Sequence, residues 1–133
     1  MTDLSGRTCL VTGATRGIGR ATAEALAKMG AQVLVHGRDS ASVGAVCREM
    51  VRYGQVAGVV GDLSSLAAVR KLAKDVASQY PRLDVLVNNA GTGALRRETT
   101  VDGYERLFAV TRVPPRRRAS SVVNRTLASF DAP

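Results

Sequence analysis

The sequence has little of what several classes of catalytic or metal site require. Its 133 residues include two cysteines, one histidine and no tryptophan, and aromatic residues make up only 4%. A lone histidine, His36, excludes a metal cluster built from histidines and a Ser-His triad with a spare base. Cys9 and Cys47 each lie inside an apolar pattern without ligand-like spacing, which indicates small buried side chains in a reducing compartment. We therefore predict no metal site.

Long apolar runs are missing as well. No stretch of about 18 apolar residues occurs, and Asp3 lies near the start, so we expect neither a transmembrane helix nor a secretory signal. An apolar fraction of 45% is nevertheless ordinary for one soluble domain, whose core must come mainly from Val, Leu and Ala. The sequence thus predicts a cytoplasmic protein without a membrane partner.

Acidic residues are outnumbered, and the excess of positive charge is unevenly spread. Residues 1–111 and residues 112–133 each carry a net charge of +4, although the second segment is far shorter. Its five arginines include Arg112 and the run from Arg116 to Arg118. Such a cluster attracts phosphate without sequence specificity. No aromatic residues alternate with these arginines, so nucleic acid is not the partner that we predict.

Residues 1–90 alternate short apolar runs with longer helical patterns. Strands are predicted at residues 7–12, 32–36, 56–60 and 83–87, and helices at 18–29, from about 40 to 53 and from about 65 to 80. Strands that alternate with helices form βαβ units around a parallel sheet, so we predict an α/β fold. The predicted buried face of the first helix comprises Ile18, Ala21, Ala25, Leu26 and Met29.

This alternation ends near residue 111. Residues 101–110 predict one more amphipathic helix, but Pro114 and Pro115 cannot continue it, because proline lacks a backbone donor and restricts the residue before it. Residues 112–133 show neither clear periodicity nor a cap pattern. We predict that they form a disordered, basic tail rich in Arg, Pro and Ser, beyond a folded domain of residues 1–111.

A glycine-rich stretch at residues 12–19, Thr-Gly-Ala-Thr-Arg-Gly-Ile-Gly, joins the first strand to the first helix. Its glycines let the backbone turn tightly and approach a phosphate, while the helix supplies unpaired N–H groups and the positive end of its dipole. The spacing differs from the general dinucleotide fingerprint Gly-x-Gly-x-x-Gly. We expect this loop to hold a dinucleotide pyrophosphate, with binding residues Gly13, Thr15, Arg16, Gly17, Ile18 and Gly19.

The second strand ends in Gly37-Arg38, and open parallel sheets bind ligands at the carboxyl ends of their strands. An acidic residue there would bind the ribose 2′-hydroxyl of NAD, whereas Arg38 offers a fork suited to a 2′-phosphate. Arg16 can add a second cation. The sequence therefore favours NADP(H) over NAD(H) as cofactor. The alternative is that both arginines are solvated surface side chains.

Two further segments follow the third and fourth strands, Asp62-Leu63 and Asn88-Asn89-Ala90-Gly91. Together with Thr-Gly-x-x-x-Gly-x-Gly at residues 12–19, they resemble the short-chain dehydrogenase/reductase family over about residues 5–110. The resemblance implies an incomplete Rossmann-like, doubly wound parallel sheet of about four strands in the order 3-2-1-4. It also implies an adenine contact for the first pair, for which a simple turn is the alternative, and cofactor-binding roles for Asp62, Leu63, Asn89, Ala90 and Gly91.

The chemistry of this family is hydride transfer between a nicotinamide and a carbonyl or alcohol carbon. It uses a serine and a tyrosine followed four residues later by a lysine, which places the tyrosine and lysine on one helix face. No Tyr-x-x-x-Lys occurs here, because the residues at that offset from the three tyrosines are Ala57, Asp84 and Phe108. We therefore assign no catalytic residue.

The sequence departs from the family pattern at Thr111, as a premature end or a shifted reading frame would produce. We expect an NADP(H)-dependent oxidoreductase by descent that is inactive as this chain alone. The alternatives are a non-catalytic dinucleotide-binding module or a defective fragment. With the pattern ending there, the fourth strand would be an exposed apolar edge, through which the chain could bind itself or a full-length relative.

Overall fold

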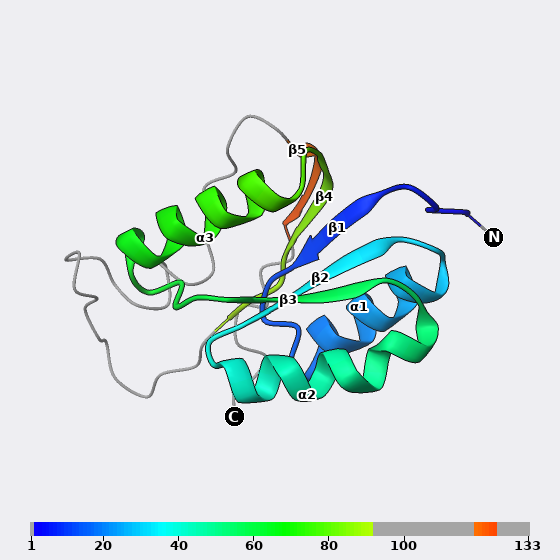
Figure 1. Ribbon diagram of the computed structural model, residues 1–133, viewed down its shortest axis with the longest axis horizontal. Helices are drawn as coiled ribbons and strands as arrows, with labels where there is room; N and C mark the ends of the chain where they lie inside the picture. Colours follow the sequence, from blue (N-terminus) through cyan, green and yellow to red (C-terminus); the bar gives the residue numbers. More distant parts are fainter. Residues whose placement is uncertain (1, 92–118, 125–133) are drawn as a thin grey trace, which may run out of the picture.

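The computed structural model describes residues 2–91 and the backbone of residues 119–124 (Figure 1). The predicted helix at 101–110 and the predicted domain boundary at residue 111 lie outside these ranges. In chain order the elements are β1 (Thr8–Val11), α1 (Gly17–Lys28), β2 (Gln32–Gly37), α2 (Ser40–Met50), the 3-10 turn η1 (Val51–Tyr53), β3 (Val56–Val60), α3 (Leu66–Gln79), β4 (Leu83–Asn88) and β5 (Ala119–Asn124).

The strands form one parallel sheet in the order β3-β2-β1-β4-β5. β1 lies in the middle, with Leu10 opposite Leu34 of β2 and opposite Leu86 of β4. The predicted order 3-2-1-4 is therefore confirmed. Because all strands run the same way, the carboxyl ends of β1 to β4 open at one edge of the sheet, together with the loops that follow them.

The strand β5 lies within residues 112–133, which the sequence predicts to be a disordered tail. Ala119–Asn124 pairs in parallel with β4, with Leu86 opposite Val122, so β4 has a neighbour where the sequence predicted an exposed edge. The domain boundary, the character of the rest of the tail and binding to a second copy or a full-length relative stay predictions. Two consecutive valines among Ser and Arg are a weak strand signal, and pairing with a neighbouring strand outweighs such local preferences. Residues 112–118 and 125–133 lie outside the described ranges.

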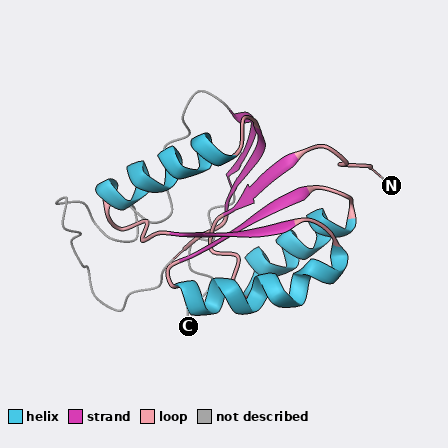
Figure 2. Ribbon diagram, viewed as in Figure 1, coloured by secondary structure: helices cyan, strands magenta, loops and turns pink. Residues whose placement is uncertain are grey.

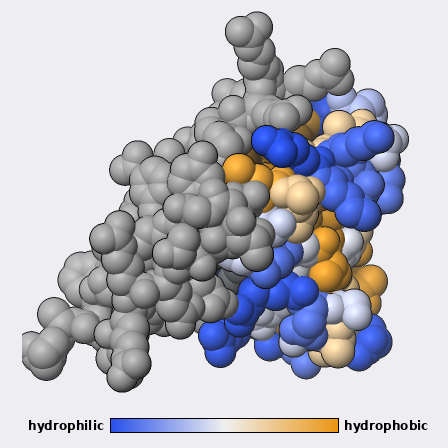
Figure 3. Space-filling view, turned by 90° about the vertical axis from the view of Figure 1, so that its left-hand side faces the viewer, coloured by the Kyte–Doolittle hydropathy of each residue, from blue (hydrophilic) through white to orange (hydrophobic). Residues whose placement is uncertain are grey.

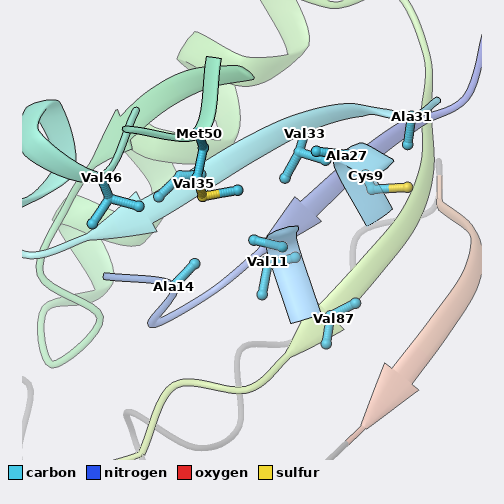
Figure 4. Close-up of a cluster of buried hydrophobic side chains, with 11 residues drawn as sticks. Cys9, Val11, Ala14, Ala27, Ala31, Val33, Val35, Val46, Met50 and Val87 are labelled. Carbon is cyan, nitrogen blue, oxygen red and sulfur yellow. The ribbon is translucent and has the colours of Figure 1, made fainter. Parts of the chain in front are cut away.

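Helices cover both faces of the sheet (Figures 1 and 2). α1 and α2 lie on one face and α3 on the other. The larger core fills the space beneath α1 and α2, where Val11, Val33 and Val35 of the sheet meet Val46 and Met50 of α2 (Figure 4). A smaller cluster on the opposite face joins Leu10, Leu34 and Leu86 to Val76 of α3. Burial of both strand faces explains why the strands read as nearly continuous apolar runs.

The buried face of α1 agrees only in part with the predicted one. Of the predicted residues, Leu26 packs against the core, but Ala21 and Ala25 are exposed and Ile18 is 42% exposed. The buried residues of the helix are Gly19, Ala23 and Ala27. A Cβ atom on Gly19 would collide with the side-chain amide of Asn89 and the carbonyl oxygen of Gly13, so the helix lies very close to these groups at this glycine. Apolar periodicity gives no weight to glycine and missed this contact.

On the side shown in Figure 3, the described surface carries hydrophilic residues with hydrophobic patches between them. Among the described residues, the exposed large apolar side chains are Ile18, Val51 and Val60. None of the described helices has the length and apolar character needed to cross a membrane.

Candidate functional site

The glycine-rich loop leaves β1 in a conformation that side chains rarely adopt. Gly13 and Gly17 both have positive φ, 61° and 60°. A Cβ atom on Gly13 would lie 2.8 Å from the Cα of Ala90, so the loop rests directly on the segment that follows β4. A Cβ atom on Gly17 would meet nothing within 4 Å. Gly17 thus leaves open space at the first residue of α1, where a bound group could approach the backbone.

Asn89 and Thr12 tie the loop to the end of β4. The Asn89 side-chain amide donates to the carbonyl oxygens of Thr12 and Gly13, both at 3.1 Å. The Thr12 hydroxyl accepts from the backbone N–H groups of Asn89 and Ala90 at 3.0 Å and donates to the carbonyl of Val87 at 3.3 Å. Both side chains are buried, at 2% and 5% exposure. The ends of β1 and β4 therefore form one rigid unit.

The amino end of α1 has no side-chain cap. Arg16 occupies the cap position with extended backbone and makes no capping hydrogen bond, and the first turn holds no acidic residue. The first N–H groups of a helix lack partners within the helix, and its dipole favours negative charge there. This end of α1, beside open space at Gly17, can hold an anion such as a pyrophosphate.

The end of β2 packs against the same loop. A Cβ atom on Gly37 would lie 2.6 Å from Cγ2 of Thr15 and 2.7 Å from Cγ2 of Val43, so glycine is required for this close approach. Arg38 follows and is exposed, as is Arg16. Asp39 caps α2, because its carboxylate accepts from the Ser42 N–H at 2.8 Å, and this hydrogen bond lowers the pKa of Asp39.

The end of β3 forms a tight turn. The Asp62 carboxylate accepts from the Ser64 N–H at 2.9 Å and from the Ser64 hydroxyl at 2.7 Å. Leu63 is buried, with 4% exposure. These hydrogen bonds to Ser64 are those of a turn residue, which was the alternative interpretation of Asp62. The residue is nevertheless exposed, so a ligand can still reach it.

His36 is the site residue that the sequence did not reveal. The side chain is only 1% exposed, yet both of its ring nitrogens have backbone partners. Nδ1 accepts from the Gly13 N–H at 3.1 Å, so Nε2 carries the proton and donates to the Gly61 carbonyl at 2.8 Å. Burial lowers the pKa of His36 from 6.5, against the opposing effects of the Gly61 carbonyl and the Asp62 charge. A lone histidine in an apolar strand gives no signal of such a role.

The carboxyl ends of β1 to β4 thus lie at one edge of the sheet, beside the glycine-rich loop. This edge provides backbone N–H groups, exposed arginines and small residues. This set suits a phosphate-bearing ligand that lies across the carboxyl edge of the sheet. Within residues 2–91, no three His, Cys, Asp or Glu side chains come together as a metal site.

Comparison with known proteins finds a family that this chain matches, and several relatives. A family model described as short chain dehydrogenase matches residues 7–124. The chain is 40% identical over 108 residues to a rhamnolipid-biosynthesis 3-oxoacyl-[acyl-carrier-protein] reductase of Pseudomonas aeruginosa, covering 80% of this chain and 42% of that protein. It spans less than half the length of the curated relatives that it matches.

Solved structures show similar folds. The NADP complex of RhlG from Pseudomonas aeruginosa superposes with a TM-score of 0.66 at 42% identity, covering 68% of this chain and 36% of that one. A metagenomic short-chain oxidoreductase in complex with NADP gives a TM-score of 0.71 at 40% identity, covering 80% and 50%.

The family match also corrects a prediction from the sequence. The sequence was expected to leave the family pattern at Thr111, yet the match continues to residue 124 and takes in β5. The fifth strand is therefore part of the family pattern. With a match over most of its length, and relatives at this level of identity, the chain belongs to the short-chain dehydrogenase family.

Proposed function

We propose that this chain binds NADP(H) at the carboxyl ends of β1 to β4, as the cofactor-binding part of an oxidoreductase. The pyrophosphate would lie over the amino end of α1 and contact Gly13, Thr15, Arg16, Gly17, Ile18 and Gly19. Arg38 would bind the 2′-phosphate. Asp62 and Leu63 would lie along the adenine, with Asn89, Ala90 and Gly91 beneath the ribose and nicotinamide.

The observation that supports this proposal best is the uncapped amino end of α1 beside Gly17. The chain leaves N–H groups there without a side-chain partner and leaves the adjacent space open. Two of the similar solved structures are complexes with NADP, which supports a dinucleotide as the ligand. Arg38 supports the choice of NADP(H), because a guanidinium can bind a phosphate through two hydrogen bonds.

The bound dinucleotide would supply the hydride chemistry, and the described residues would bind and orient it. Thr12 and Asn89 hold the loop in place, and the buried strand ends keep water away from its underside. The sequence has no Tyr-x-x-x-Lys, so we propose binding without turnover for this chain alone. Loss of a general acid/base costs a reaction about 10² to 10⁴ in rate.

Calorimetric titration with NADPH and NADH tests the proposal through one matched pair of variants. Gly17 and Gly6 both have positive φ, and a Cβ atom on either would meet nothing within 4 Å. Gly17→Ala and Gly6→Ala should each lose about 1 kcal/mol of folding stability. Only Gly17→Ala should weaken NADPH binding, by about tenfold or more, because its methyl group enters the phosphate site.

Wild-type chain should bind NADPH at micromolar concentration and about tenfold more tightly than NADH, the difference expected for one charge-assisted contact to the 2′-phosphate. No NADPH binding up to millimolar concentration, by a chain that circular dichroism shows to be folded, would contradict the proposal. Equal loss of affinity in both glycine variants would place the ligand elsewhere.

A further inference from the structure

His36 lies between three segments that come from different parts of the chain. Its donor partner, Gly13, is 23 residues away in the sequence, and its acceptor partner, Gly61, is 25 residues away. The His36 backbone joins in, since its carbonyl accepts from the Ala14 N–H at 2.9 Å. The Gly61 N–H donates in turn to the carbonyl of Gly37 at 3.1 Å. The imidazole is thus the side-chain link between the glycine-rich loop and the turn that holds Asp62.

We propose that His36 is a positioning residue for the dinucleotide: its neutral imidazole fixes the glycine-rich loop relative to the turn after β3, and its protonation releases the loop. These two segments are the ones that we assign to the pyrophosphate and to the adenine. Their separation decides whether one rigid dinucleotide can reach both. The inference therefore rests on the proposed function and adds its regulation by pH.

The chemistry of the imidazole gives the direction of the effect. In the neutral ring, Nδ1 is an acceptor and Nε2 is a donor, which matches the two backbone partners. In the protonated ring both nitrogens are donors. The Gly13 N–H would then face an N–H group, and the cation would be buried almost completely. The contact to Gly61 survives protonation, but the contact to the glycine-rich loop does not.

The surrounding charges do not reverse this direction. Burial lowers the pKa of His36, and the Asp62 carboxylate only partly opposes it. β3 contributes no titratable side chain and β1 contributes only Cys9. The other charged or titratable groups on the loops and on the helix covering this face are Arg16, Arg38, Asp39, Arg70, Lys71, Lys74 and Asp75. Asp39 is exposed and accepts from the Ser42 N–H, and Asp75 is paired with Lys71. The imidazole is therefore neutral at pH 7 and gains its proton below pH 6.5.

Two substitutions separate the two hydrogen bonds. His36→Asn places a carbonyl oxygen near the position of Nδ1, so it can accept from Gly13 and cannot be protonated. His36→Gln places an amide nitrogen near the position of Nε2, so it keeps the contact to Gly61 and loses the contact to Gly13. At pH 7.5, both variants should bind NADPH about fivefold to tenfold more weakly than wild type, because each keeps only one of the two hydrogen bonds that link the loop to the turn.

Nuclear magnetic resonance tests the link without a ligand. His36 is the only histidine, so its Hε1 resonance is unambiguous. We expect its titration midpoint below pH 6.5, with the Gly13 amide resonance moving at the same midpoint in wild type and staying fixed in His36→Asn. Should the chain unfold first, its stability should fall from pH 7 to pH 5.5 in wild type and stay level in His36→Asn. A midpoint at or above 6.5, or a Gly13 amide that ignores the titration, would overturn the proposal.

Calorimetry with NADPH then connects the link to binding. Because the 2′-phosphate itself titrates near pH 6, the readout is the ratio of the wild-type dissociation constant to that of His36→Asn. We expect this ratio to rise between pH 7.5 and pH 5.5 by less than about tenfold, because one proton that binds with a midpoint below pH 6.5 cannot change it further. A flat ratio, with NADPH bound by both proteins, contradicts the positioning role alone. Absence of binding at every pH contradicts the proposed function, and the resonance of Gly13 then still decides whether His36 fixes the loop.

Discussion

The amino ends of α1 and α2 lie on the same face of the sheet but are completed differently. α2 begins after Asp39, whose carboxylate accepts from the Ser42 N–H, and α3 begins after Ser65, whose hydroxyl accepts from the Ala68 N–H. α1 begins after Arg16, which makes no such bond although its backbone is extended like that of the other two caps. Two helices are capped by their own side chains, and the third leaves its first N–H groups without a side-chain cap.

The difference in capping changes both the stability of each helix end and the access to its first N–H groups. A capping side chain contributes about 1 kcal/mol of stability and occupies the space in front of the first N–H groups. At α2 and α3 that space has no other use in the described structure. At α1 the loop replaces a cap with glycine, an exposed arginine and close packing against Asn89, which lowers local stability but leaves the N–H groups accessible. Three sets of variants test this difference between the helix ends.

The largest effect is expected where α1 meets the sheet. Gly19→Ala should lose about 2 to 3 kcal/mol of folding stability, because the added methyl group collides with Asn89 and with the Gly13 carbonyl. Gly44→Ala in α2 is the matched control, since its nearest contact is the flexible end of Arg48 at 3.4 Å. The control should gain about 0.5 to 1 kcal/mol, as alanine does in helix interiors. Urea unfolding measures both, and two variants of equal stability would contradict the close approach of α1.

A smaller effect is expected from converting the α1 end to the α2 type. Arg16→Asp supplies the missing cap, and Arg16→Ala removes the same cation without supplying one. The unliganded Asp variant should be about 0.5 to 1 kcal/mol more stable than the Ala variant. It should also bind NADPH more weakly than the Ala variant, because its carboxylate occupies the N–H groups and repels phosphate. Should the Asp variant be more stable and bind equally well, the phosphate does not lie over α1.

The smallest effect on binding is expected at the opposite edge of the sheet. Asp84, at the amino end of β4, is 3% exposed and accepts from the Thr8 N–H, from Arg82 and from Arg7. The Thr8 N–H, followed by the two arginines, lowers the pKa of Asp84 from 3.8 to about 2. Its stabilising effect is therefore complete above pH 3.8 and is lost as the pH falls towards 2.

Asp84→Asn should accordingly be less stable than wild type at pH 7, and the two proteins should converge as the pH approaches 2. Circular dichroism of acid unfolding measures this. NADPH affinity at pH 7.5 should not change in the folded variant, because Asp84 lies at the edge away from the glycine-rich loop. A loss of affinity there would show that the two edges are coupled. High salt should reduce the difference, since both arginines are more than half exposed.

Sequence reasoning located most elements and the segments of the candidate site. β3 falls at the predicted residues, and the glycine-rich loop, Arg38, Asp62 and Asn89 do lie at the carboxyl ends of successive strands. Their assignment to parts of a dinucleotide is a proposal. Periodicity was right for α1 only in part, because Gly19, whose Cβ atom would collide with Asn89 and Gly13, carries no apolar signal. It failed for β5, because that strand forms through pairing with β4 rather than through its own preference.

The alternation of strands and helices and the positions of the turns could be predicted from the sequence, because apolar spacing and glycine chemistry act over a few residues. The family resemblance was also visible there. The contacts of His36 with Gly13 and Gly61, the hold of Asn89 on the loop and the pairing of β5 with β4 emerged only from the folded structure. These contacts join residues far apart in the chain, and their energies depend on burial and strand pairing that exist only once the sheet has formed.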